Sequence, residues 1–117
     1  MTAAELRCLR ELLGLSTRAL AAAIGRSERN VARWENGQQR LARDTAEALA
    51  ELADYTDAAV DALVAAAPDT ISVYRNDGEF RAHEDTGARV LSAAWHRMVA
   101  ARAAERIPGA VITYHDE

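Results

Sequence analysis

The stretch 15–37 (LSTRALAAAIGRSERNVARWENG) constrains the fold most, because it has the pattern of a helix, a glycine turn and a second helix. Ser16 and Ser27 can cap the two helices, since a serine there accepts a hydrogen bond from the first turn. Gly25 between them suits the left-handed conformation that often ends a helix. The spacing predicts two short helices with their apolar faces packed together, formed by Leu20, Ala21, Ile24, Val31 and Trp34.

This stretch resembles, without gaps, the helix-turn-helix of the lambda-repressor/Cro (Xre-type) family. Two positions depart from the family pattern: Thr17 stands where the family often has a phosphate-contacting glutamine, and Arg26 stands where an apolar residue is usual. The resemblance implies a helical DNA-binding domain at the N-terminus. It rests on Leu20-Ala21, Ile24-Gly25, Ser27, Val31 and the block Arg33-Trp34-Glu35-Asn36-Gly37.

In such a motif the second helix lies in the major groove of DNA. Arginine can bind guanine through two acceptors, asparagine can pair with adenine, and glutamate can accept from cytosine. We therefore expect base contacts from Glu28, Arg29, Asn30 and Arg33. We expect phosphate contacts from Thr17, Arg18, Arg26, Asn36, Gln38 and Arg40. The alternative is that these side chains form an ordinary solvated helix face.

The charge distribution supports nucleic acid as a partner, although the whole chain carries a net charge of −4. Residues 1–43 hold eight arginines and four glutamates, a balance of +4. Residues 44–117 hold six arginines and fourteen acidic residues, a balance of −8. The positive excess thus lies with the helix-turn-helix pattern, where phosphates would be met.

Composition limits the remaining classes of protein. The 117 residues suit one compact domain, or a small domain with an appended module. No apolar run is long enough for a membrane span, and we expect no membrane partner. The single cysteine, Cys8, allows no internal disulfide and fits the cytoplasm. Every basic residue is an arginine, which is typical of a GC-rich bacterial or phage genome.

Two further helices are predicted in the first part of the chain. One runs from Thr2 to Leu13, with Thr2 and Glu5 forming a capping box. A long one runs over 44–67, with Asp44 and Glu47 as a second capping pair, and ends before Pro68. Its acidic residues Asp54, Asp57 and Asp61 are expected on a solvated face.

The tail has the pattern strand–helix–strand, with strands over 70–75 and 110–115 and a helix over about 86–106. A turn is predicted at 76–78, and 79–85 is ambiguous. Two short strands do not make a stable sheet, so we expect strands of a second chain to complete it in a homodimer. The expected interface comprises Ile71, Val73, Tyr74, Leu91, Trp95, Met98, Val111, Ile112 and Tyr114.

The predicted fold is thus mainly α with a small β element. It has a lambda-repressor-like helix-turn-helix domain with a long fourth helix over 1–67 and a strand–helix–strand dimerisation module over 68–117. This order of elements looks similar to the YdiL-like, anti-CRISPR-associated repressors. That resemblance implies a dimeric repressor of an inverted-repeat operator that regulates its own gene and often a neighbouring phage or toxin gene.

No enzyme, cofactor or metal site is predicted. His83, His96 and His115 show no metal-ligand spacing among themselves or with Cys8. Three alternatives to the repressor stay open. The chain could be an antitoxin whose tail binds a toxin, an interaction protein that has lost DNA binding, or an RNA-binding protein that uses the same arginines.

Overall fold

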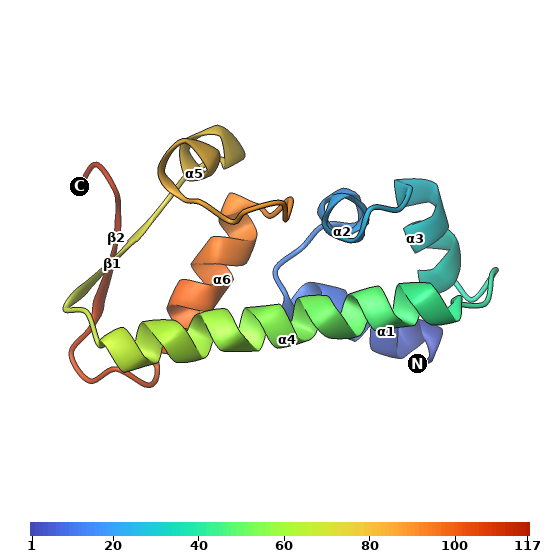
Figure 1. Cartoon of the computed structure of the whole chain (residues 1–117), viewed down its shortest axis with the longest axis horizontal. Coiled ribbons are helices and arrows are strands. Elements are labelled where there is room, and N and C mark those ends of the chain that lie inside the picture. Colours follow the sequence, from blue (N-terminus) through green and yellow to red (C-terminus); the bar gives the residue numbers. More distant parts are fainter.

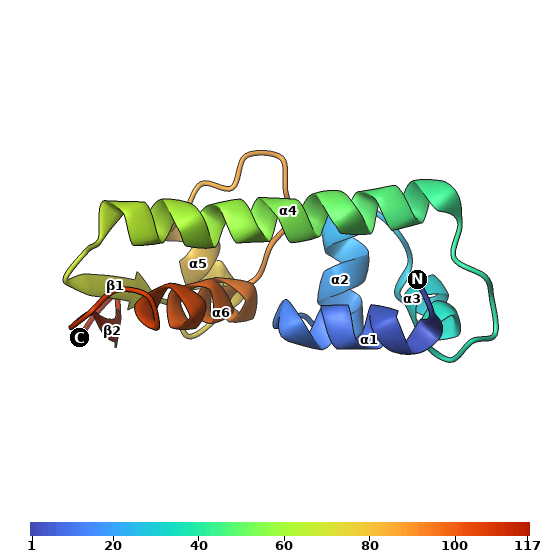
Figure 2. The same cartoon turned by 90° about the horizontal axis from the view of Figure 1, so that it is seen from below.

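The structure is a computed structural model that describes all 117 residues, and it confirms a mainly helical fold with a small β element. The long helix α4 (Arg43–Ala66) runs along the length of a molecule that measures 45 × 27 × 21 Å. Helices α1–α3 gather around its N-terminal half, and β1, α5, α6 and β2 gather around its C-terminal half (Figures 1 and 2). We call residues 1–42 the headpiece and residues 68–117 the tail.

The headpiece contains α1 (Ala3–Leu12), α2 (Thr17–Ile24) and α3 (Glu28–Glu35). The predicted capping box of α1 is confirmed, because the Thr2 hydroxyl accepts from Glu5 N and Glu5 accepts from Thr2 N. The apolar faces of α1–α3 and of the first half of α4 meet in one core. Its buried members there are Leu6, Leu13, Leu15, Leu20, Ala21, Ile24, Val31, Trp34, Leu49 and Leu52.

The tail contains β1 (Thr70–Val73), α5 (Asp77–His83), α6 (Ala93–Ala104) and β2 (Val111–Tyr114). The two strands pair with each other in parallel, with Thr70 opposite Val111 and Val73 opposite Tyr114. Parallel strands need a long crossover, which α5 and α6 supply. The two strands therefore form a sheet within one chain, and its completion by strands of a second chain stays a prediction.

The helical part of the tail also differs from the prediction. Asn76 caps α5 rather than forming a turn, and the ambiguous segment is mostly this helix. The predicted helix over 86–106 begins only at Ala93, where Ser92 caps it by accepting from Trp95 N. The tail is thus strand–helix–helix–strand.

The C-terminal half of α4 is joined to α6 by hydrogen bonds as well as by apolar contact. Trp95 Nε1 donates to the buried Thr56 hydroxyl at 3.0 Å, and that hydroxyl donates to Leu52 O at 2.8 Å. Arg102 of α6 and Arg106, two residues beyond its end, bind Asp57 and Asp61 at 3.0 and 2.9 Å. Asp54, Asp57 and Asp61 of α4 are all exposed, as expected, and two of them carry these ion pairs at the surface.

The predicted capping pair at the start of α4 is also wrong. Ala42 is the N-cap residue and makes no side-chain cap hydrogen bond. Asp44 instead accepts from Thr45 N at 2.9 Å and pairs with Arg26 at 3.3 Å. At the other end α4 stops at Ala66, and Ala67 takes a left-handed conformation (φ 46°) before Pro68.

Candidate nucleic-acid interface

The α2–turn–α3 unit is fixed by local interactions that its sequence specifies. The Ser16 hydroxyl accepts from Ala19 N at 3.0 Å, and the Ser27 hydroxyl accepts from Asn30 N at 3.1 Å. Gly25 ends α2 with φ 66° and ψ 39°, in the left-handed region. Val31 and Trp34 anchor the inner face of α3 in the headpiece core, being 0% and 5% exposed. The opposite face of α3 is accessible to solvent.

Three long polar side chains of α3 carry the chemistry of its outer face. Arg29 is exposed and Asn30 and Arg33 are half-buried. None of these three side chains makes a hydrogen bond or an ion pair within the chain. Their donors are therefore available to an outside partner, as base contacts in a DNA groove require.

Glu28, the fourth residue expected at a base, is exposed and has a partner within the motif. The Thr17 hydroxyl donates to Glu28 Oε1 at 3.2 Å, and this bond connects the first turns of α2 and α3. One carboxylate oxygen remains free to accept from a base. Glu28 also lies in the first turn of α3, where a negative charge is favourable.

Arg26 does not occupy the position expected of a phosphate contact. Its guanidinium turns toward the start of α4 and donates to Thr45 Oγ1, Ile24 O and Asp44 Oδ2 at 3.3, 3.1 and 3.3 Å. It also donates to Gly25 O. These bonds tie the α2–α3 turn to α4, so the structure gives Arg26 a role in holding the motif together.

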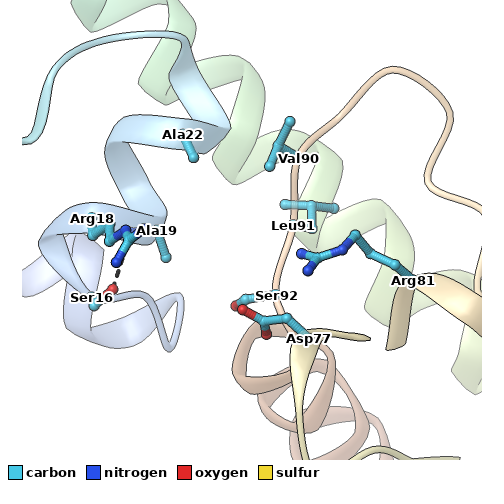
Figure 3. A pocket seen from close by; sticks show the side chains of 9 residues that line it. All are labelled: Ser16, Arg18, Ala19, Ala22, Asp77, Arg81, Val90, Leu91 and Ser92. Carbon is cyan, nitrogen blue, oxygen red and sulfur yellow. Dashed lines mark hydrogen bonds between the residues drawn. The ribbon is translucent and has the colours of Figure 1, made fainter. Parts of the chain in front are cut away.

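Arg18 lines a cleft of about 430 Å³ between α2 and the tail (Figure 3). Arg81 and Asp77 of α5 lie across this cleft, beside Leu91 and Ser92 (Figure 3). Arg18 therefore lies at the boundary between headpiece and tail. The other expected phosphate contacts, Asn36, Gln38 and Arg40, are exposed and follow α3 in the loop that leads to α4.

A buried ion pair that the sequence reasoning missed positions α3 against α1. Arg10 Nε and Nη2 donate to the two carboxylate oxygens of Glu35 at 2.7 and 2.9 Å, and Nη1 donates to Leu15 O at 3.0 Å. The two side chains are only 14% and 7% exposed. The hydrogen bonds to Glu35 raise the pKa of Arg10. The only hint of this ion pair in the sequence is that Glu35 belongs to the block 33–37 that matches the helix-turn-helix pattern.

The structure also brings together residues that the sequence reasoning treated as unrelated. All three histidines lie around the ring of Tyr74 in the tail. No group of three histidine, cysteine or acidic side chains is arranged to hold a metal ion. The histidines are thus a cluster of a different kind from a metal site.

The nine residues expected at a dimer interface divide into three groups by their burial. Ile71, Val73, Tyr74, Leu91 and Trp95 are buried within one chain, so they belong to its own core rather than to a free surface. Met98 is half-buried and packs near Gly14 of the headpiece, and Tyr114 is half-buried beneath the Arg75 guanidinium. Val111 and Ile112 of β2 remain open to solvent, at 54% and 39% exposure.

Two capped helices joined through a left-handed glycine, with a polar outer face on the second helix, define a helix-turn-helix DNA-binding domain. The comparison with protein families agrees: residues 3–63 match the model of the helix-turn-helix domain. The chain belongs to this family, and it is a DNA-binding regulator. The match includes the headpiece except its first two residues, and most of α4. No curated protein matches the chain. None of its helices is both long and apolar enough to cross a membrane.

Proposed function

We propose that the chain is a dimeric transcriptional repressor that binds an inverted-repeat operator upstream of its own gene. The observation that carries the proposal is the outer face of α3. There Arg29, Asn30 and Arg33 present donors that no group of the chain uses, on a helix whose inner face is fixed by the core. A helix held in this way can enter the major groove without rearrangement.

Base reading is assigned to Arg29 and Asn30 first, with Glu28 and Arg33 beside them. Thr17, Asn36, Gln38 and Arg40 flank α3 and are assigned to phosphates, as backbone-positioning contacts. We leave Arg26 out of this set because its guanidinium donates hydrogen bonds to α4 and to the α2–α3 turn. We leave Arg18 out because it lines the cleft toward the tail.

The tail supports dimerisation through its sheet. A two-stranded sheet has only marginal stability by itself. Its outer edges carry unpaired backbone N–H and C=O groups to which another strand can hydrogen-bond. Val111 and Ile112 of β2 add exposed apolar surface at this place. A dimer would present two copies of α3 and read two half-sites, as an inverted repeat requires. The tail is folded and contributes buried apolar residues to the core of the chain, which favours dimerisation over an antitoxin with a disordered tail.

The test of DNA reading is fluorescence anisotropy on the DNA upstream of the chain's own gene, at several salt concentrations. Native protein should prefer this DNA to a scrambled duplex by ~10³-fold or more. Arg29→Ala should weaken specific binding by about 1–3 kcal/mol and relax the preference. Arg106→Ala removes the same charge just after α6, away from the motif, and is the matched control. Equal losses in both variants would contradict base reading by α3.

Dimerisation is tested separately by analytical ultracentrifugation of the full chain at micromolar concentration. We expect twice the 12.7 kDa mass of one chain for the native protein. Ile112→Asp should give a folded monomer, because it places a charge on an exposed position of β2. A native monomer that still binds the upstream DNA would remove the dimer from the proposal and keep the DNA reader. Co-purification with a neighbour-encoded protein would favour the antitoxin.

A further inference from the structure

The three histidines of the chain, far apart in sequence, meet around one tyrosine ring in the tail. The Tyr74 ring centroid lies 5.5 Å from His83 of α5, 5.5 Å from His96 of α6 and 5.2 Å from His115 after β2. The His83 and His115 rings are themselves only 4.7 Å apart. Phe80 closes the cluster at 5.4 Å from His96. Both helices of the tail, and the residue that follows each strand, thus contribute a ring to the cluster.

The hydrogen bonds of the cluster suit neutral imidazoles. Nδ1 of His96 and Nδ1 of His115 are buried and have no hydrogen-bond partner. A neutral ring can keep one nitrogen as an acceptor, whereas an imidazolium carries N–H on both nitrogens. A proton added at either Nδ1 would create a buried donor without an acceptor, which is costly. In His83 the Nδ1 atom lies 2.9 Å from Glu79 O and already has a partner.

Only one carboxylate is within ion-pair distance of the rings. Glu84 Oε1 accepts from the Tyr74 hydroxyl at 3.0 Å and lies 3.5 Å from His96 Nε2. The other charged groups around the cluster are distributed over its elements. They are Glu79 of α5, with one buried and unpaired oxygen, Arg97 of α6, which donates to Tyr74 O, and Arg75, which binds Asp116 after β2.

Burial decides the protonation of His96. Desolvation lowers the pKa of its imidazole, assisted by the Arg97 charge and opposed by Glu84. Because the folded pKa lies below the ordinary value of 6.5, this histidine stabilises the closed tail fully above pH 6.5. That contribution is lost as the pH falls through the folded value.

We propose that this histidine cluster is an acid-sensitive latch: neutral rings hold α5 and the end of β2 against α6, and protonation releases them while the headpiece stays folded. The contact that would open first is the last rung of the sheet, where His115 N donates to Val73 O at 3.0 Å. The cluster lies wholly in the tail, so its response to acid does not depend on whether the chain binds DNA.

The direct test is amide hydrogen exchange of the full chain by NMR at pH 7.5 and pH 5.5, expressed as protection factors corrected for intrinsic exchange. The pKa of His96 is lowered in the closed form, so acid favours the open tail, by up to about tenfold between pH 7.5 and 5.5 for one histidine with a pKa of 6.5 when released. Protection of the His115 amide should therefore fall at pH 5.5, by up to about tenfold. Protection of the Val31 amide in α3 should not change. An unchanged His115 protection factor, or an equal fall at Val31, would overturn the proposal.

A variant at His96 distinguishes release of this cluster from a general loss of stability of the chain at low pH. His96→Gln keeps a polar side chain of similar size that does not titrate, so the acid-induced loss of protection at His115 should be largely abolished. An unchanged loss in the variant would exclude His96 as the trigger. The native protein offers a second measurement that needs no variant. The His96 ring protons should titrate with a midpoint below 6.5, and a midpoint at or above that value would contradict the latch.

Discussion

Thr56→Val is the sharpest test of how the tail is held on α4. Thr56 is fully buried, and its hydroxyl both accepts from Trp95 Nε1 at 3.0 Å and donates to Leu52 O at 2.8 Å. Valine has the same shape without the hydroxyl, so packing is kept while both bonds are lost. The Leu52 carbonyl keeps the backbone hydrogen bond of the α-helix, but the buried indole N–H of Trp95 loses its only hydrogen-bond partner.

The expected cost follows from these two bonds. A typical hydrogen bond contributes about 0.5–1.5 kcal/mol net, and a buried donor left unpaired costs about 1–3 kcal/mol. Because these contributions overlap, we expect Thr56→Val to lower the free energy of unfolding by about 2 kcal/mol. Thr56→Ser keeps the hydroxyl and removes one methyl group, so its cost should be about 1 kcal/mol.

Urea unfolding followed by circular dichroism at 222 nm measures both variants. Trp95→Phe and the double variant complete a double-mutant cycle, which isolates the energy of the Thr56–Trp95 pair. We expect a coupling energy of at least about 1 kcal/mol. A Thr56→Val cost that is unchanged in the Trp95→Phe background would show that this hydrogen bond does not stabilise the junction.

Three other substitutions test separate parts of the fold by the same unfolding assay. Glu35→Gln leaves the Arg10 charge largely buried without its carboxylate and should cost about 3 kcal/mol or more, whereas loss of the exposed Arg7–Glu11 pair should cost far less. Gly14→Ala should cost about 1–2 kcal/mol for its left-handed backbone (φ 69°) alone, with a further loss because the new methyl would lie 3.1 Å from Ala94 O. Ala67→Gly should instead raise stability by up to ~1 kcal/mol, because it relieves a left-handed alanine while adding some unfolded-state entropy. A destabilised Ala67→Gly chain, or a neutral Gly14→Ala chain, would contradict the backbone argument at that position.

The headpiece could be predicted from sequence because its signals are local. Ser16, Gly25 and Ser27 act within one turn of their own position, and each adopts the expected conformation. The apolar spacing of α2 and α3 then determines which faces meet. What this reasoning could not supply were the long-range partners of charged residues. Arg26 turns to Asp44, eighteen positions away, and no local pattern indicates such a pairing.

The tail was harder to predict because its structure depends on contacts between distant segments. The strand at 70–73 pairs with the strand at 111–114 in parallel, and no turn signal identifies a parallel pair. The segment 86–92 was predicted to be helical because Leu91 and Trp95 are four positions apart, but Ser92 caps the helix and it begins only at Ala93. The same crossover brings the three histidines together, which spacing along the chain could not show.

The central claim, that the outer face of α3 binds DNA, is tested most directly by NMR. Amide and side-chain signals of the full chain are followed while the duplex from upstream of its gene is added. The account predicts the largest shifts at Arg29, Asn30 and Arg33, with smaller shifts at Thr17 and Gln38 and little change in the tail core around Trp95. Shifts confined to the tail, or none at a DNA excess that saturates binding, would contradict it.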